Sequence, residues 1–283
     1  MGRYVGHALE SVGSQIYSYW EVIVVDDAGP EDGTRTTVDA FARRFSANRI
    51  EFIRRDRNGG VSAARNTAIA SAQGEFLAFL DPDDFWDPRH LSEQVKVLTS
   101  NRHVDVAYAG VDFVDKDGTV IGTFKPSDKF IEDFPKPLYC KNEIHLSTVV
   151  ARKLIVCQVG GFDESPEIQH VEDWDLWIRL ALAGAKFERT AAPQVCYRRH
   201  LESASADDSK MLQRSVNLMK KHHTEFRVVE ALYLNCHRLE IESQQLQGRY
   251  DGLKSIYNRT IDRRSKNLVK KLLGRKSTSD GVV

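Results

Sequence analysis

The chain has 283 residues, enough for one large domain or for one domain with an appendage. Its 40 Lys and Arg residues balance its 40 Asp and Glu residues, so the formal net charge is zero, which argues against a general nucleic-acid-binding protein. Hydrophobic residues make up 41% of the chain, an ordinary globular share, and no apolar stretch reaches the ~20 residues that span a bilayer.

The cysteines and the first residues of the chain indicate the cellular compartment in which the protein is expected. Cys140, Cys157, Cys196 and Cys236 are widely spaced and follow no metal-binding or disulfide pattern, which favours a reducing compartment. The segment Met1–Tyr4 lacks the apolar core of a signal peptide. We therefore expect a cytoplasmic protein.

The first part of the chain alternates between helical and strand patterns. Val5, Leu9, Val12 and Ile16 repeat at helical spacing and form one apolar stripe, whereas the β-branched run before Asp26 is typical of a buried strand. The predicted elements are a helix over 4–17, a strand over 21–27, a helix over 38–45, a strand over 50–53, a helix over 61–73 that Gly74 terminates, and a strand over 75–80. This alternation predicts an α/β fold with a mostly parallel sheet and flanking helices.

The remaining elements are less regular. They are a helix around 91–98, a strand over 104–114, a hairpin turn at Asp117-Gly118, an irregular loop over 125–142, a strand over 146–150, a turn over 160–163 and a helix from Glu172 to Gly184. Beyond about residue 205, glycine and proline become rare and long polar helical stretches dominate. We predict a domain over 1–205 and a helical C-terminal extension over 206–283.

An acidic cluster, Asp81-Pro82-Asp83-Asp84, directly follows the predicted strand over 75–80. Ligands of open α/β sheets bind beyond the carboxyl ends of the strands. Three close carboxylates repel one another unless a cation neutralises them, and Asp oxygens suit Mg²⁺ or Mn²⁺. On spacing alone, a solvated acidic turn that caps the next helix explains the cluster equally well.

Four further motifs each have an ordinary structural explanation when taken alone. Asp26-Asp27 ends a strand, and Asn58-Gly59-Gly60 precedes the helix that carries Arg65. Glu172-Asp173 opens a helix and complements its dipole. Tyr197-Arg198-Arg199-His200 is typical of a strand end at the surface.

Taken together and in order, these motifs resemble the family 2 glycosyltransferases over residues 1–205. The resemblance implies the GT-A type of fold, a Rossmann-like nucleotide-sugar domain joined to an acceptor-binding half. It implies transfer of a sugar from a nucleotide-sugar donor, expected to be UDP-linked, to a hydroxyl of a glycan, lipid-linked or protein acceptor such as a growing surface glycan. The implied mechanism is a single displacement that inverts the anomeric centre.

The resemblance also implies roles for individual residues. Asp27 matches the residue that hydrogen-bonds the uracil ring, and Arg65 matches its neighbour at the base or phosphate. Asp83 and Asp84, together with Asp81, match the element that binds the ribose and a divalent metal, Mg²⁺ or Mn²⁺. Asp173 matches the general base, and His200 matches a late histidine that reaches the metal or diphosphate.

Two other functions compete with this one. A haloacid-dehalogenase-like phosphatase also places Asp-x-Asp after a strand, but its DxDx[TV] pattern disagrees with Asp84-Phe85 after Asp83. A nucleotide-sugar-fold binding protein without activity is the second alternative. This alternative is favoured because the first strand of the family is not evident in the chain. Without that strand, the strands over 22–25 and 76–80 are expected to have no shared partner strand, and the chain is expected to be a truncated or inactive form.

The last segment, 261–283, carries seven basic and two acidic residues and has apolar residues that can share one helical face. A basic amphipathic helix binds anionic lipid surfaces, so peripheral contact with the inner face of the membrane is one expectation. A solvated or helix-packing tail is the alternative.

Overall fold

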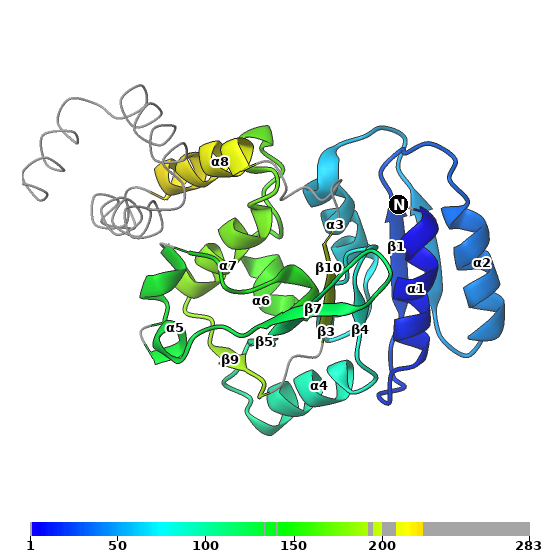
Figure 1. Ribbon diagram of the computed structural model, residues 1–283, viewed down its shortest axis with the longest axis horizontal. Coiled ribbons are helices and arrows are strands. Elements are labelled where there is room, and N and C mark those ends of the chain that lie inside the picture. The colour runs from blue at the N-terminus through cyan, green and yellow to red at the C-terminus, as the bar shows by residue number, and fades with distance from the viewer. Residues whose placement is uncertain (1, 133, 140, 192–194, 200–207, 223–283) are drawn as a thin grey trace, which may run out of the picture. The chain divides into compact units, whose positions relative to one another are not determined.

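The computed structural model describes residues 2–132, 134–139, 141–191, 195–199 and 208–222 (Figure 1). The chain divides into two compact units, one made of Met1–Leu138 and Asn142–Ala206, the other of Tyr139–Lys141 and Asp207–Val283. The second unit contributes one described helix, α8 (Asp208–Lys221). His200 and the basic segment 261–283 lie outside the described residues. Within the part that is described, no helix is long and apolar enough to cross a membrane.

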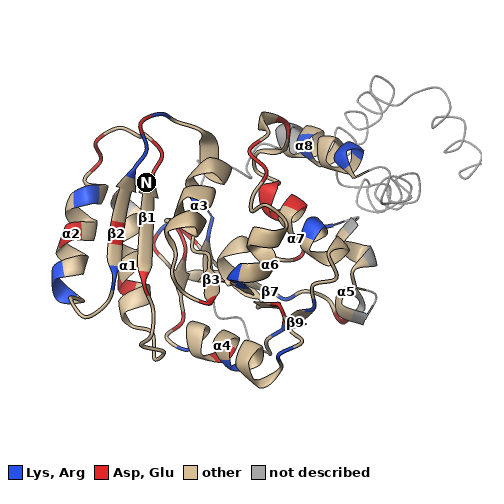
Figure 2. Cartoon of the chain, turned by 180° about the vertical axis from the view of Figure 1, so that it is seen from behind, with Lys and Arg blue, Asp and Glu red and all other residues tan. Residues whose placement is uncertain are grey.

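The N-terminal part of the first unit consists of α1 (Gly2–Gly13), β1 (Val22–Asp26), α2 (Thr34–Arg44), β2 (Ile50–Arg54) and α3 (Gly60–Ser71). Strands β1 and β2 are parallel, with Val24 opposite Phe52. The apolar stripe of α1 is buried against α2, because Leu9 and Phe41 belong to one cluster that also covers the two strands. Figure 1 shows α1 and α2 beside this strand pair, and Figure 2 shows both signs of charge on α2. The predicted helices and strands of this part are confirmed, but the first helix ends at Gly13 rather than at residue 17, and Ile16 lies beyond it and is 67% exposed.

The predicted end of α3 is wrong in one respect. Gly74 does not terminate the helix in a left-handed conformation; α3 ends at Ser71 and the next residue, Ala72, is extended at φ −59° and ψ 140°. The backbone N–H groups of Gln73 and Gly74 instead donate to the Glu21 carboxylate at 2.6 and 2.8 Å. A side chain from the start of β1 therefore fixes this connection, which local sequence does not reveal.

The rest of the first unit contains two four-stranded sheets. One has the order β3 (Phe76–Ala78), β8 (Val150–Arg152), β5 (Val106–Tyr108), β9 (Phe187–Arg189). The other has the order β4 (Phe85–Trp86), β10 (Val195–Arg198), β6 (Val111–Val114), β7 (Val120–Phe124). The accompanying helices are α4 (His90–Ser100), α5 (Asp128–Glu132), α6 (Lys153–Gln158) and α7 (Glu172–Leu182), with short 3-10 turns at Lys136–Tyr139, Leu146–Thr148 and Pro166–Ile168.

Mixed strand direction refines the predicted architecture. The α/β fold with flanking helices is confirmed, but among the described residues three strand pairs are parallel and four are antiparallel. The antiparallel pairs arise because β8, β4 and the β6–β7 hairpin run against their neighbours. Within the described part, β1 and β3 lie in different sheets and share no partner strand.

Three local predictions differ from the structure. The predicted strand over 104–114 is two strands, β5 and β6, which belong to different sheets. The break falls at Gly110, where an added Cβ would lie 2.5 Å from the Phe124 carbonyl oxygen, so the close approach of the next strand requires glycine. Residues 146–148 form a 3-10 turn, and the strand predicted there begins at Val150. The loop predicted over 125–142 contains α5 and a 3-10 turn.

Candidate active site

The acidic turn Asp81–Asp84 lies directly after β3, and one of its carboxylates points into the protein. Asp84 is only 2% exposed. Its two oxygens accept hydrogen bonds from the Ser147 hydroxyl at 2.6 Å and from the Arg198 backbone N–H at 3.0 Å. Burial and the neighbouring carboxylates of Asp81 and Asp83 raise the pKa of Asp84 well above its usual value. Asp84 thus binds the turn to the core.

Arg198 holds the same turn from the end of β10. Its Nε donates to the Asp83 carbonyl oxygen at 2.9 Å, and its Nη1 donates to the carbonyl oxygens of Asp115 and Lys116 in the β6–β7 turn. Its Nη2 lies 3.1 Å from Nδ1 of His7 on α1. The motif Tyr197-Arg198-Arg199-His200 predicts a strand end at the surface, yet Arg198 is only 3% exposed. In the sequence, two consecutive arginines at the end of an apolar strand could have indicated this buried role.

Asp27 lies at the carboxyl end of β1 and organises the glycine turn before α3. Its carboxylate is paired with Arg55 and accepts the backbone N–H groups of Gly59 at 3.1 Å and Gly60 at 2.7 Å. The Asn58 side chain donates to the Asp27 carbonyl oxygen at 3.0 Å. These bonds satisfy free N–H groups at the start of α3, as a helix N-terminus requires.

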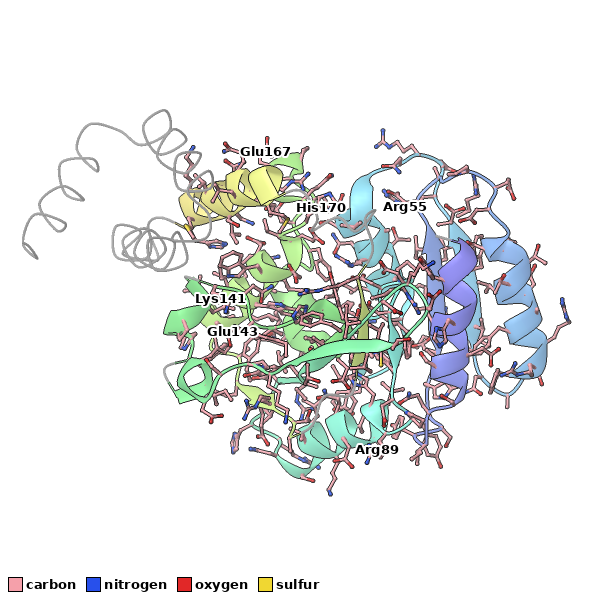
Figure 3. All side chains as sticks on the ribbon, viewed as in Figure 1. Arg55, Arg89, Lys141, Glu143, Glu167 and His170 are labelled. Atoms are coloured by element: carbon pink, nitrogen blue, oxygen red, sulfur yellow. The ribbon has the colours of Figure 1, made fainter. Side chains whose placement is uncertain are left out.

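The segment before α7 approaches this glycine turn from another part of the chain. An added Cβ at Gly60 would lie 2.7 Å from Nε2 of Gln169, and Gly60 has a φ of +85°. Figure 3 labels Arg55, which follows β2, and His170, which precedes α7; both lie in the region of the turn. The first unit therefore brings the end of β1, the start of α3 and the start of α7 together.

Arg65 on α3 links the acidic turn to α7. Its Nη2 donates to Asp81 Oδ1 at 2.8 Å and its Nη1 donates to Glu172 Oε1 at 2.5 Å. The guanidinium carbon also lies 5.3 Å from the centre of the Phe162 ring. A planar guanidinium suits this double contact because its nitrogens form a rigid fork. Both carboxylates raise the pKa of Arg65 above its usual value, against the effect of burial.

The first two residues of α7 are acidic and differ in their surroundings, and Figure 2 shows the acidic start of this helix. Glu172 is 5% exposed, and its Oε2 has no hydrogen-bond partner among the described residues. The Asp173 carboxylate accepts the Asn142 amide at 3.1 Å and the Trp174 backbone N–H at 2.7 Å. Burial and the negative charge of Glu172 raise the pKa of Asp173 to about 7, although Arg65 opposes this shift.

The structure thus gathers Asp81, Arg65, Glu172 and Asp173 from three segments that are distant in the sequence. Sequence reasoning missed Asn142, which falls in the predicted irregular loop, and the bridging contacts of Arg65. Within the described ranges, no three His, Cys, Asp or Glu side chains are arranged to hold a metal ion together. The predicted contribution of His200 lies outside those ranges.

Comparisons with known proteins identify the family. The family model described as "Glycosyl transferase family 2" matches residues 2–150. The UDP-Glc:alpha-D-GlcNAc-diphosphoundecaprenol beta-1,3-glucosyltransferase WfaP of Escherichia coli is 31% identical over 212 residues, which cover 75% of this chain and 78% of that protein. An uncharacterised glycosyltransferase of Methanocaldococcus jannaschii is 28% identical over 66% of this chain, and the match spans 62% of that relative's length.

Solved structures share the fold. The mannosyltransferase PcManGT from Pyrobaculum calidifontis, in complex with GDP-Man and Mn²⁺, matches with a TM-score of 0.61 and 17% identity, over 99% of this chain and 78% of that one. S. aureus TarS in complex with UDP matches with a TM-score of 0.61 and 18% identity, over 94% of this chain and 74% of that one. With the family model matching more than half of its residues, the chain belongs to the family 2 glycosyltransferases.

Proposed function

We propose that the protein is an inverting glycosyltransferase that moves a sugar from a nucleotide-sugar donor, UDP-linked, to a hydroxyl of a lipid-linked or other growing surface glycan. The observation that carries the proposal is the state of Asp173, a carboxylate at the start of α7. Its pKa is raised to about 7, and hydrogen bonds from Asn142 and the Trp174 N–H fix its position. A general base works best when its pKa lies near the operating pH. The names of WfaP and of the TarS complex support a UDP-linked donor.

The proposed reaction is one displacement. The acceptor hydroxyl gives its proton to the Asp173 carboxylate while its oxygen forms a bond to the anomeric carbon of the sugar. The bond between that carbon and the diphosphate oxygen breaks, and its electron pair leaves with the nucleoside diphosphate. Because attack and departure occur on opposite faces of the carbon, the anomeric centre inverts.

The donor-binding part of the proposal uses the carboxyl edge of β1 and the acidic turn. Asp27 is fixed there by Arg55 and by the N–H groups of the glycine turn, and we assign it to the nucleobase. Asp83 is assigned to the ribose and the diphosphate side of the donor. The turn that carries Asp83 is held on both sides, by Asp84 inside the core and by the Arg198 bond to the Asp83 carbonyl oxygen.

A divalent metal fits the acidic turn only together with the donor. The mutual repulsion of Asp81, Asp83 and Asp84 contributes to the raised pKa of Asp84, so the turn carries negative charge that a cation would neutralise. Since Asp84 is buried and its oxygens accept hydrogen bonds from Ser147 and Arg198, we assign the metal-facing role first to Asp83. The metal roles that the resemblance implies for Asp84 and His200 stay predictions. When bound, Mg²⁺ or Mn²⁺ would supply charge for the leaving diphosphate, whose oxygens complete the ion's shell.

A donor screen followed by a transfer assay tests the proposal. Thermal shift with UDP- and GDP-sugars, with and without Mn²⁺, identifies the donor. The protein is then incubated with that donor and a lipid-linked N-acetylglucosaminyl diphosphate, and the product is analysed for the anomeric configuration of the new bond. We expect an inverted linkage whose formation Asp173→Asn abolishes. Tight donor binding without transfer to a panel of hydroxyl acceptors would instead indicate a nucleotide-sugar-binding protein.

A further inference from the structure

The guanidinium of Arg65 joins the acidic turn to the helix that carries the proposed base. The distances are 2.8 Å to Asp81 Oδ1 and 2.5 Å to Glu172 Oε1. The Arg65 side chain is 18% exposed, so solvent screens these two ion pairs less than it would at the surface. Both terminal nitrogens of the guanidinium, Nη1 and Nη2, therefore donate to protein carboxylates, although the resemblance placed Arg65 at the base or phosphate of the donor.

Three charged groups act on Asp173, each from a different segment. Glu172 on its own helix and Asp81 after β3 are negative, and Arg65 on α3 is positive. The two groups that donate hydrogen bonds to Asp173, the Asn142 amide and the Trp174 backbone N–H, are neutral. Arg65 thus stands in contact with both of the negative groups that disfavour ionisation of Asp173.

Glu172 makes this arrangement sensitive to the loss of Arg65. Its carboxylate is almost fully buried, and Oε2 has no hydrogen-bond partner among the described residues. A buried carboxylate whose partner is removed is strongly disfavoured. Without Arg65, the negative charges of Glu172 and Asp81 would act on Asp173 unopposed, and Asp173 would therefore bind its proton more tightly.

We propose that Arg65 is a positioning residue for the transfer reaction: by bridging Asp81 and Glu172 it keeps Asp173 available as a base in the neutral pH range. The inference rests on the proposed function, because Asp173 acts as a base only if the protein transfers a sugar to a hydroxyl. In this arrangement Glu172 holds the Arg65 guanidinium in place and at the same time disfavours ionisation of Asp173.

The pH dependence of turnover separates this role from a structural one. We compare wild type, Arg65→Gln, Glu172→Gln and a matched control, Arg152→Gln. Arg152 is 19% exposed and pairs with Glu75 at 2.9 Å, in contacts that involve neither Asp173 nor its neighbours. The acid limb of the profile is the pH range in which turnover falls as Asp173 becomes protonated. We expect this limb to move to higher pH by about one unit in Arg65→Gln, which lowers turnover about tenfold at the foot of the limb.

The two other variants complete the comparison. Glu172→Gln removes a negative neighbour of Asp173, so the acid limb of this variant should move to lower pH. Arg152→Gln should lower the midpoint of thermal unfolding and leave the limb at its wild-type pH. Opposite shifts in Arg65→Gln and Glu172→Gln are not expected of general structural damage. A folded Arg65→Gln protein whose limb coincides with that of wild type overturns the proposal.

Two further measurements keep the test decisive. Arg65→Lys retains the charge but reaches only one carboxylate, so its limb should lie between those of wild type and Arg65→Gln; a wild-type limb would contradict the bridging role. If wild type transfers no sugar, the proposed function fails by itself. Infrared titration of the carboxylic-acid band that Asp173→Asn removes then tests Arg65 directly, and the band should persist to higher pH in Arg65→Gln.

Discussion

The carboxylate of Asp84 accepts a 3.0 Å hydrogen bond from the backbone N–H of Arg198, 114 positions later in the chain. This bond ties the acidic turn after β3 to the end of β10. Asp84 therefore supports the structure of the turn, whereas its neighbour Asp83 is assigned to the donor.

Substitutions at these two neighbouring positions are therefore expected to change different quantities, the free energy of unfolding at Asp84 and the donor affinity at Asp83. Asp84→Ala leaves the Arg198 N–H and the Ser147 hydroxyl without their acceptor inside the core, which costs about 1–3 kcal/mol of unfolding free energy for each orphaned group. Asp83→Asn should keep the fold and reduce metal-dependent UDP affinity. Urea unfolding and calorimetric UDP titration with Mn²⁺ measure the two quantities. Strong metal-dependent UDP binding in Asp83→Asn would remove Asp83 from the proposed metal site.

Asp173→Asn should lower turnover by at least the roughly 10²-fold that is typical of a lost general base, while donor affinity stays near that of wild type. The reason is that Asn keeps the shape and the acceptor for the Trp174 N–H but cannot take a proton. Steady-state transfer kinetics and donor titration check this. The reverse pattern, with Glu172→Gln inactive and Asp173→Asn active, would mean that the base is Glu172.

Gly60→Ala tests the close approach of the segment before α7 to the glycine turn. Gly60 and Gly33 have nearly equal φ angles, +85° and +84°, so replacement by alanine imposes a similar backbone penalty of about 1–2 kcal/mol at both. Only at Gly60 does the new Cβ meet a neighbour, Gln169 at 2.7 Å; at Gly33 nothing lies within 4 Å. Gly60→Ala should therefore displace the flexible end of the Gln169 side chain and weaken donor binding, whereas Gly33→Ala should leave donor binding unchanged; both should lower the unfolding midpoint by similar amounts. Equal donor affinities in the two variants would show that the contact is unimportant.

Two histidines, one buried and one half-buried, predict a loss of stability in mild acid. His90 is fully buried and neither ring nitrogen has a hydrogen-bond partner among the described residues; burial lowers its pKa to about 3. Burial also lowers the pKa of His145 to about 4, helped by the charge of Arg199. The unfolded chain binds these protons near pH 6.5 and the folded chain does not, so stability is complete above pH 6.5 and falls as the pH drops towards 4.

Urea unfolding between pH 7.5 and 4.5 measures this dependence. Each histidine contributes a slope of at most about 1.4 kcal/mol per pH unit in that window. His90→Phe keeps an aromatic ring against Trp86, on which His90 is stacked at 4.7 Å, and should reduce the slope. The exposed His103 offers the control His103→Gln, which should leave it unchanged. An undiminished slope in His90→Phe would refute the contribution of His90.

The motifs and the order of the elements could be read from the sequence because they depend on short-range patterns. The spacing of Val5 and Leu9 predicts α1, and the apolar run before Asp81 predicts a strand that ends at an acidic turn. Gly184 ends α7 with a φ of +89°, as its position predicts. The ordered motifs indicate the family, and the family model confirms it.

Tertiary structure alone decided how the candidate residues use their charges. Side chains that are alike in sequence, such as Asp83 and Asp84, receive different roles because only Asp84 meets Ser147 and Arg198 in the core. Arg65 and Glu172 lie 107 positions apart, and no local pattern predicts their ion pair. Propensity and periodicity act over a few neighbouring residues, whereas ion pairing and burial depend on which distant segments the packed chain brings together.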